Sequence, residues 1–284
     1  MNVRIKFSKY GIAKFIGHLD VVRYFQRAIR RSGLEVAYSE GFNPHQLLYF
    51  AAPLGLGETS DGEYMDVEFL LEYPKEEIKE RLNAVMAEGF FIHTVTKLAE
   101  WMPNTKKESV MSLTSCADYM VSVKDVDVED SGIVKPYAEW LSGMPEGIKE
   151  FLDSDKILVE KNIKKGKREI DAKPMIFAWG FTPEDIKGER YGISYAESYQ
   201  NGMRLFLKLA SGSVENLKPE LLMEAYCIKN HIPYKESALQ FHRMEIYCDL
   251  SLRSMNHEEA REAISEGKRR REFVPLYRLG DNGI

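Results

Sequence analysis

Four arginine side chains share one face of a predicted helix, and a guanidinium group can bind a phosphate through two hydrogen bonds. Between His18 and Arg31 the apolar residues recur with helical spacing, and the arginines fall within about 100° of arc on the opposite side. Asp20 lies on the same face, where it would orient one guanidinium. The pattern predicts an anion-binding surface, and a solvated face with charge pairs between neighbouring turns is the alternative. The four residues are Arg23, Arg27, Arg30 and Arg31.

The loop that follows this helix combines residue types that recognise nucleobases or cofactor rings. An exposed Phe42 would offer a stacking surface, while Asn43 and His45 would offer hydrogen bonds. The alternative is a structural turn in which Phe42 packs into the core and Asn43 caps the backbone. The candidate binding residues of the loop are Ser39, Gly41, Phe42, Asn43 and His45.

A second glycine-containing segment, PLGLG at residues 53–57, precedes two further candidates for substrate binding. Gly55 and Gly57 lack the third glycine and the strand-helix-strand context of a dinucleotide site, so we expect them to allow close backbone packing. Glu63 and Tyr64 follow at the start of the next predicted strand.

Histidine and carboxylate side chains are the candidates for catalysis. His18 and His45 would act as an acid–base pair on a ribose hydroxyl, as in metal-independent endoribonucleases built on paired ferredoxin-like domains. Asp20 and Asp66 form an alternative pair. Both histidines would instead be structural if they bond to backbone groups.

A charged hairpin is predicted in the second half of the chain, turning at residues 164–167. Lys167, Arg168 and Asp171 lie on its exit and are candidate substrate-binding residues. A solvated turn is the alternative.

The elements needed to position these residues follow an α+β pattern. Two-residue alternation predicts strands over 3–11, 63–73 and 90–98, and helical spacing predicts helices over 18–31 and 74–86. With residues 38–54 as a turn-interrupted strand region, the order is β-α-β-β-α-β, typical of a ferredoxin-like domain.

The second half repeats this order. Strands are predicted over 119–124, 203–210 and 241–250, and helices over 133–144 and 217–232, with the hairpin region at 156–181 between them. We therefore expect two ferredoxin-like domains in tandem, arising from a duplication. The predicted division is an N-terminal domain over 1–100, a linker over 101–115, a second domain over 116–252 and a basic C-terminal tail over 253–284.

Composition narrows the class of protein. The 284 residues are 44% hydrophobic and 29% charged, with a net charge of −5, whereas residues 1–50 hold eight basic and three acidic side chains. This asymmetry favours one anion-binding face. The start of the chain lacks the apolar region of a signal peptide, and no apolar run approaches a membrane span, so we expect a cytoplasmic protein with no membrane partner. Cys116, Cys227 and Cys248 are too scattered for a disulfide framework or a zinc site.

The run FIGHLDVVRYFQRAIRRSGLEVAYSEGFNPH, followed by PLGLG and GEYMDVEF, resembles the radical SAM-associated domain-of-unknown-function family. The resemblance is close over residues 1–100 and looser through KREIDAKP and LKPELLMEA. It implies a radical S-adenosylmethionine (SAM) protein as partner. The family's recurrent positions correspond to His18, Asp20, Arg27, Arg30, Ser39, Gly41, Phe42, Asn43, Pro44, Pro53, Gly55, Glu63 and Tyr64.

A radical SAM enzyme holds its [4Fe–4S] cluster through CxxxCxxC, a motif that this sequence lacks. We therefore expect no cofactor on this chain, and S-adenosylmethionine and the cluster on the partner only. The leading hypothesis is a non-catalytic accessory protein that recognises an RNA-like, phosphate-bearing substrate for modification by that partner. The alternatives are an RNA-cleaving or RNA-modifying enzyme that needs no metal, and a pure protein-interaction module that docks its arginine face onto an acidic protein.

Overall fold

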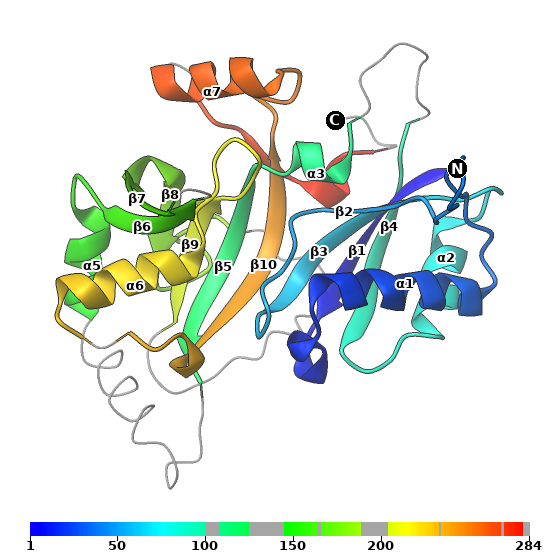
Figure 1. The fold of residues 1–284 in the computed structure, drawn as a ribbon, viewed down its shortest axis with the longest axis horizontal. Helices are drawn as coiled ribbons and strands as arrows, with labels where there is room; N and C mark the ends of the chain where they lie inside the picture. Colours follow the sequence, from blue (N-terminus) through cyan, green and yellow to red (C-terminus); the bar gives the residue numbers. More distant parts are fainter. Residues whose placement is uncertain are drawn as a thin grey trace, which may run out of the picture.

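The computed structural model describes residues 1–99, 108–124, 145–163, 166–188, 204–232, 234–267 and 270–280. Within these residues the chain forms a mixed α+β structure whose centre is one nine-stranded sheet (Figure 1). The strand order along the sheet is β4-β1-β3-β10-β5-β9-β8, with β2 added to β3 and β11 added to β10.

The N-terminal half contributes four strands and two helices. Its sheet order is β4-β1-β3-β2, and all neighbouring pairs are antiparallel. The predicted extended region over 38–54 contains only one short strand, β2, and an isolated bridge between Tyr38 and Gln46. The elements are β1 (Asn2–Lys9), α1 (His18–Ser32), β2 (Leu48–Phe50), β3 (Thr59–Glu68), α2 (Lys75–Asn83) and β4 (Phe90–Lys97).

The second half has the strand order β10-β5-β9-β8, which matches β4-β1-β3-β2 position by position. A separate two-stranded hairpin, β6-β7, confirms the predicted hairpin, while the helix predicted over 133–144 lies outside the described residues. The elements are β5 (Cys116–Val123), α5 (Pro145–Asp153), β6 (Leu158–Ile163), β7 (Gly166–Asp171), β8 (Ile176–Gly180), β9 (Leu205–Ala210), α6 (Pro219–Lys229) and β10 (Leu239–Asp249).

The two halves join through a short parallel contact between β3 and β10. Only two residue pairs make it, His242 with Thr59 and Arg243 with Ser60. Gly62 makes this approach possible, because a Cβ atom there would lie 2.7 Å from the Cα atom of Glu245. Each half nevertheless has its own main hydrophobic core.

Between the two halves lies a four-residue helix, α3 (Val110–Leu113), which precedes β5. The last part of the chain folds back over the junction. It begins with α7 (His257–Glu266), which follows β10 and has a capping box at Asn256 and Glu259. The short strand β11 (Phe273–Pro275) then pairs with β10, and η4 (Leu276–Arg278) contacts β1 and β4. Part of the predicted basic tail is therefore regular structure.

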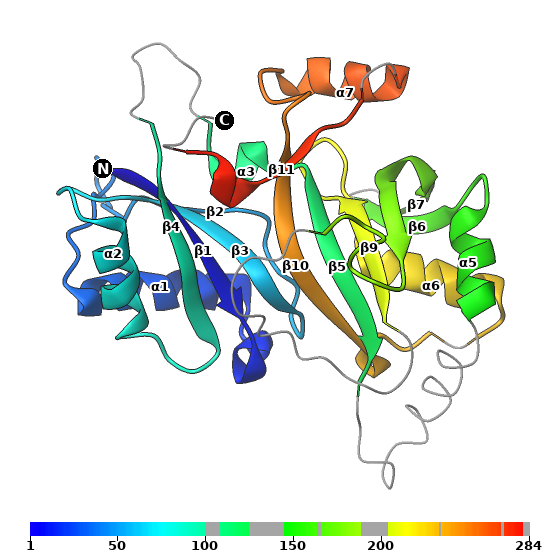
Figure 2. The same ribbon diagram turned by 180° about the vertical axis from the view of Figure 1, so that it is seen from behind.

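The helices α1 and α6 lie on the same face of the sheet (Figure 1), and Figure 2 shows the strands from the other face. Val3, Ile5 and Phe7 of β1 belong to the core beneath α1, so their neighbours Arg4, Lys6 and Ser8 point to the opposite face. Those three polar side chains are also buried.

Candidate functional site

The predicted arginine face is present on α1. The helix buries Val21, Phe25, Ala28 and Ile29 against the sheet and ends at Gly33, whose φ of 70° is left-handed. The opposite side exposes all four predicted arginines, namely Arg23, Arg27, Arg30 and Arg31.

Three of these arginines have no carboxylate partner among the described residues. The Nε atom of Arg27 donates to the carbonyl of Arg23 at 3.3 Å, and Nη2 of Arg31 donates to the carbonyl of Val85 at 3.1 Å. Arg30 likewise donates to a helix carbonyl, that of Gln26. Because each guanidinium has five N–H donors, most of them face solvent here and can bind an external anion.

Asp20 lies beside the arginine row, as predicted. Its Oδ1 atom is 3.3 Å from Nη1 of Arg23, and both side chains are more than half exposed. An exposed pair of this kind contributes at most about 1 kcal/mol, so Asp20 positions Arg23 without neutralising the rest of the row.

The loop over residues 39–45 is closed by bonds between its two ends. The Ser39 hydroxyl accepts from the backbone N–H of His45 at 3.1 Å and lies 2.8 Å from its Nδ1 atom. Phe42 is 105% exposed, so its packing into the core, the structural alternative, is wrong. Gly41 has a φ of 115°, which only glycine adopts readily. The loop thus presents an aromatic ring to solvent.

The structure does not bring His18 and His45 together. The His18 ring contacts the Phe50 ring, with centroids 5.7 Å apart. Burial lowers the pKa of His18, and the charge of Glu63 opposes that shift. His45 instead bonds to Ser39, next to the bridge that joins Tyr38 and Gln46. No contact among the described residues links the two histidines.

Residues of β1, the PLGLG segment and β3 lie around His18. A small cavity of about 20 Å³, the size of one water molecule, is lined by residues including His18, Lys9, Leu54 and Glu63. The Lys9 ammonium donates to the Ile16 carbonyl at 3.0 Å, and burial lowers the pKa of Lys9 against the opposing effect of Glu63. The cavity is too small for a substrate.

Glu63 and Tyr64 make internal contacts. Glu63 accepts two bonds from Nη2 of Arg243, at 2.7 and 2.6 Å, and both side chains are buried. The Tyr64 hydroxyl donates to Glu245 at 2.5 Å, and burial raises its pKa well above the ordinary value. In this structure the polar groups of both candidates connect the two halves.

The PLGLG segment brings a carboxyl group between the halves. A Cβ atom on Gly55 would lie 1.8 Å from Oε1 of Glu58, so the glycine makes room for that side chain. Burial, reinforced by the carboxyl group of Glu220 on α6, raises the pKa of Glu58 to about 8. At Gly55 the close neighbour is therefore a side chain, whereas the prediction was a close approach of backbone, and the Cβ position of Gly57 lies in open space.

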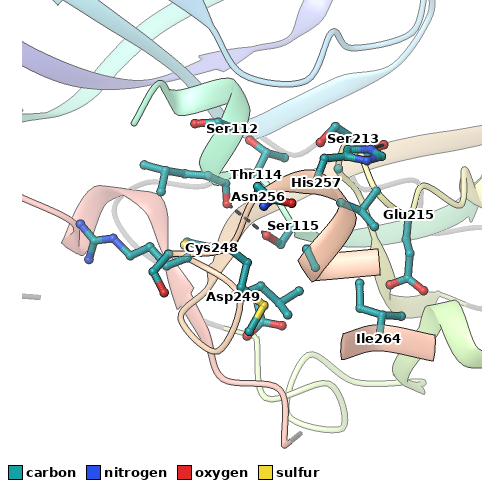
Figure 3. Close-up of a pocket in the computed structure, with 18 of the residues that line it drawn as sticks. Ser112, Thr114, Ser115, Ser213, Glu215, Cys248, Asp249, Asn256, His257 and Ile264 are labelled. Carbon is teal, nitrogen blue, oxygen red and sulfur yellow. Dashed lines mark hydrogen bonds between the residues drawn. The ribbon is translucent and has the colours of Figure 1, made fainter. Parts of the chain in front are cut away.

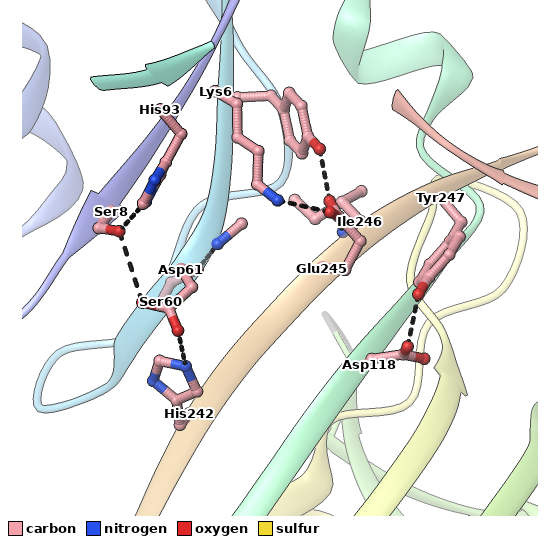
Figure 4. A network of polar contacts seen from close by, with 12 residues as sticks. Lys6, Ser8, Ser60, Asp61, His93, Asp118, His242, Glu245, Ile246 and Tyr247 are labelled. Carbon is pink, nitrogen blue, oxygen red and sulfur yellow. Dashed lines mark hydrogen bonds and ion pairs between the residues drawn. The ribbon is translucent and has the colours of Figure 1, made fainter. Parts of the chain in front are cut away.

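On the opposite face of the sheet, buried charged side chains form ion pairs, and one of these pairs, Lys6 with Glu245, crosses the junction (Figure 4). Lys6 lies 2.6 Å from Glu245, and Arg4 binds Asp66 at 2.8 and 3.0 Å. Burial raises the pKa of Glu245, an effect that Lys6 opposes. Asp66, an alternative catalytic candidate, therefore has a buried guanidinium as its partner.

A buried chain of hydrogen bonds continues from this network. Asp61 Oδ1 is 3.4 Å from the Ser8 hydroxyl, which also contacts His93, and Asp61 Oδ2 is 3.2 Å from Nε2 of His242. Nδ1 of His242 in turn lies 2.8 Å from the Thr59 hydroxyl. Burial lowers the pKa of His93 to about 4, so the ring is neutral at pH 7.

Sequence reasoning missed both of these histidines. His93 and His242 lie inside predicted strands, and a histidine within an alternating strand carries no local signal of its hydrogen-bond partners. The one available clue was the number of polar residues at alternate positions of β1, which Arg4, Lys6 and Ser8 occupy.

A cavity of about 440 Å³ lies beneath α7 (Figure 3). Its polar groups are already engaged with one another: Arg271 binds Asp249 and Glu215, and Arg253 binds Glu108. His257 contacts the carbonyl of Ser213 at 3.2 Å. None of the predicted site residues lines this cavity.

The hairpin residues lie far from α1. Figures 1 and 2 place β6-β7 beside α5 and α6, at the other end of the molecule. Lys167 pairs with Glu160, while Asp171 accepts backbone N–H groups of Ile157 and Lys173 at 3.1 and 3.0 Å. Arg168 is exposed.

In the part of the chain that the structure describes, no group of three or more His, Cys, Asp or Glu residues could hold a metal ion. The three cysteines are buried and unbridged, and burial raises the pKa of Cys227 to about 11 and that of Cys248 to about 12. None of the described helices combines the length and apolar character needed to cross a bilayer.

Comparisons with other proteins give one family match. No curated protein matches the chain. One solved structure, a heavy metal efflux pump in its crystal form II, shares 10% identity over 88% of this chain and 28% of its own. The TM-score is 0.20, a similarity too low to relate the two folds. The family described as "Uncharacterized protein conserved in bacteria (DUF2344)" matches residues 2–219. Because that match covers most of the 284 residues, the chain belongs to this family.

Proposed function

We propose that this chain is a non-catalytic recognition protein that binds an RNA-like, phosphate-bearing substrate along α1 for modification by a separate radical SAM enzyme. The observation that carries the proposal is the row of exposed guanidinium groups on α1, three of them without a carboxylate partner among the described residues. Arginine suits phosphate because its fork donates two parallel hydrogen bonds.

The loop over residues 39–45 supplies the second element of such a surface. It follows the C-terminal end of α1, where Arg30 and Arg31 lie, and it exposes Phe42. Phosphate contacts give affinity, and stacking of unpaired bases on aromatic rings is typical of single-stranded RNA recognition. We expect the arginines to bind the backbone and Phe42 to stack on a base.

The repeated strand order supports an interpretation as two ferredoxin-like domains in tandem, β4-β1-β3-β2 and β10-β5-β9-β8. In this interpretation the first domain binds the substrate and the second extends its sheet. The S-adenosylmethionine and the [4Fe–4S] cluster belong to the partner enzyme, which the resemblance of the N-terminal motifs implies, and both proteins act in the cytoplasm.

The geometry gives less support to an RNA-cleaving enzyme. His18 and His45 have separate sets of contacts, and the Ser8 and His93 pair is buried. Incubating the purified chain alone with RNA tests this alternative, since turnover that disappears in His18→Ala would favour it over the recognition protein.

The direct test is binding of a fluorescein-labelled single-stranded RNA to the full chain, measured by fluorescence anisotropy at several salt concentrations. We expect affinity to fall steeply with salt, and each of Arg27→Ala and Arg30→Ala to reduce the slope of log K against log salt by about 0.7. Arg261→Ala, an exposed arginine on α7, is the matched control. Binding without salt dependence, or an equal loss in the control, would refute the proposal.

A further inference from the structure

The cavity beneath α7 lies between this helix and the end of the sheet. Figure 1 shows α7 beyond the sheet, and Ala260 is the one buried residue of the helix. Ala260 and Ile264, one helical turn apart, both line the cavity. Its volume of about 440 Å³ lies within the range of about 300–1,000 Å³ that is typical of small-molecule sites. The cavity is therefore large enough to hold an organic ligand.

Three further segments form the walls, and backbone hydrogen bonds fix each of them (Figure 3). At the start of β5, the N–H of Ser115 donates to a carbonyl of β10 at 2.9 Å. In the turn after β9, the N–H of Gly212 donates to the carbonyl of Glu215 at 2.8 Å. In the turn after β10, the N–H of Met255 donates to the carbonyl of Leu252 at 3.0 Å. The walls are thus preformed, as in most ligand sites.

The wall formed by α3 and the start of β5 offers hydrogen-bond acceptors. Three hydroxyl groups there, those of Ser112, Thr114 and Ser115, donate their protons to backbone carbonyls at 2.9, 2.8 and 3.2 Å. A hydroxyl oxygen that has donated its proton still has lone pairs that accept hydrogen bonds. This wall therefore suits a ligand that carries N–H donors.

The charged side chains that line the cavity leave one carboxylate poorly balanced. They are three carboxylates and two guanidinium groups, from Glu108, Glu215, Asp249, Arg253 and Arg271. Arg253 binds both oxygens of Glu108, and Nε of Arg271 binds the fully buried Asp249. Glu215 has, among the described residues, only the remaining contact with Arg271, from Nη1 at 3.3 Å. The excess negative charge of the cavity therefore lies at Glu215.

The rest of the lining includes apolar side chains, among them Val214, Leu252 and Ile264. A bare metal ion would gain nothing from these side chains, and no group of three or more metal-binding side chains occurs among the described residues. An anion would meet the carboxylate of Glu215. A molecule with a cationic donor at one end and an apolar body matches both parts of the lining.

We propose that the cavity beneath α7 binds a small organic cation, with its ammonium group on Glu215 and the hydroxyl oxygens and its apolar body against Ile264. An ammonium group has three N–H donors and no acceptor, which matches a wall of acceptors. This inference goes beyond the proposed function and does not depend on it, because none of the arginines of α1 lines the cavity.

The test titrates tryptamine, an indole ring joined to an ammonium group by two methylene groups, into the full chain by isothermal titration calorimetry at pH 7. We expect a Kd of about 1 mM or lower, the range in which a small ligand is measurable. Indole-3-propionate, which carries a carboxylate on the same ring and linker, is the control with reversed charge. It should bind at least about tenfold more weakly.

Two variants alter the site in different ways. Glu215→Gln removes the unbalanced charge, and Ile264→Trp fills the space beneath α7; each should weaken tryptamine binding at least about tenfold. Glu262→Gln, at an exposed position of α7 outside the cavity, is the matched control and should leave binding unchanged. Thermal melts of the three variants check that each is folded, and Ile264→Trp tests the site with its ion pairs intact.

Four outcomes would overturn the inference: no binding of tryptamine, equal binding of indole-3-propionate, equal loss in Glu262→Gln, or binding that survives both site variants. Equal binding of uncharged 3-ethylindole would also overturn it, because the cavity would then select only the apolar body. RNA binding of Glu215→Gln, measured in parallel, should equal that of the wild type, so the two proposals are tested separately.

Discussion

Two sets of basic side chains on opposite faces of the N-terminal sheet differ in whether they have carboxylate partners within the fold. On the strand face, Arg4 and Lys6 are buried and bind Asp66 and Glu245. On the outer face of α1, the arginines are exposed, and only Arg23 has a described carboxylate partner. The first set is neutralised within the fold, whereas the second is available to an external anion.

This difference changes the interpretation of the local excess of positive charge counted from the sequence. The eight basic residues within positions 1–50 include Arg4, Lys6 and Lys9, all of which are buried. The carboxylates that neutralise Arg4 and Lys6 lie outside that window, one of them on β10. The predicted anion-binding face is therefore limited to the exposed arginines of α1.

The largest expected effect comes from breaking the buried set. Lys6→Met should lower the free energy of unfolding by about 3–5 kcal/mol, because it leaves Glu245 buried without its cation. Urea unfolding measures the loss. Arg23→Met, which breaks the exposed pair with Asp20, is the control and should cost no more than about 1 kcal/mol.

A double variant sharpens the same comparison. Lys6→Met combined with Glu245→Gln removes both charges and should recover a large part of the stability lost in Lys6→Met. If Lys6→Met is as stable as Arg23→Met, the pair between Lys6 and Glu245 is not a buried ion pair of the kind described.

Gly62→Ala should have the next largest effect, because it acts on the junction itself. The added Cβ would lie 2.7 Å from both the Cα of Glu245 and the carbonyl oxygen of Met244, backbone atoms that cannot rotate away. We expect a loss of about 1–3 kcal/mol in unfolding free energy. An unchanged free energy of unfolding in Gly62→Ala would contradict the close approach of β3 and β10.

The buried carboxyl group of Glu58 predicts a pH dependence. Its folded-state pKa of about 8 exceeds the ordinary value of 4.5, so the native state binds the proton more tightly than the unfolded state. Stability from this group is complete below pH 4.5 and is lost as pH rises to about 8, by at most about 1.4 kcal/mol per pH unit.

The interval from pH 6.5 to 8 isolates this effect from that of His93. The pKa of His93 is lowered to about 4, so its contribution is complete above pH 6.5 and is lost as pH falls towards 4. Urea unfolding at several pH values should therefore show wild-type stability falling between 6.5 and 8. The fall should be absent in Glu58→Gln; an unchanged slope in that variant would contradict the assignment.

The smallest effect on stability is expected on the exposed face. Arg27→Ala and Arg30→Ala should each change the free energy of unfolding by no more than about 0.5 kcal/mol, because both side chains, within the described residues, bond only to their own helix. A thermal melt checks this. A large loss would show that these arginines stabilise the fold and would remove the basis for treating them as a binding surface.

Local patterns in the sequence predicted the elements better than their contacts. The helix over 18–31, the strand over 90–98 and the hairpin agree closely with α1, β4 and β6-β7, because each follows from periodicity or turn residues within a short segment. The strand predicted over 63–73 is instead β3, Thr59–Glu68, since pairing with β1 and β10 decided its ends.

Contacts between distant segments had no local signal. The sequence did not show whether the halves share a sheet, and the decisive feature is the pairing of β3 with β10. The partners of Glu63, Tyr64 and Lys6 all lie on β10. Glu63 and Tyr64 were chosen as binding candidates for their chemistry alone, and their polar groups connect the halves.

The position of β10 near the end of the chain affects how the protein folds during synthesis. Lys6 and its partner Glu245 are 239 residues apart, so the ribosome completes the N-terminal half long before its buried cation can be paired. Contacts of such large sequence separation slow folding. The nascent N-terminal half therefore exposes the edge of β3 and lacks the Glu245 partner of Lys6 until β10 emerges, and it depends on that late strand to complete its sheet.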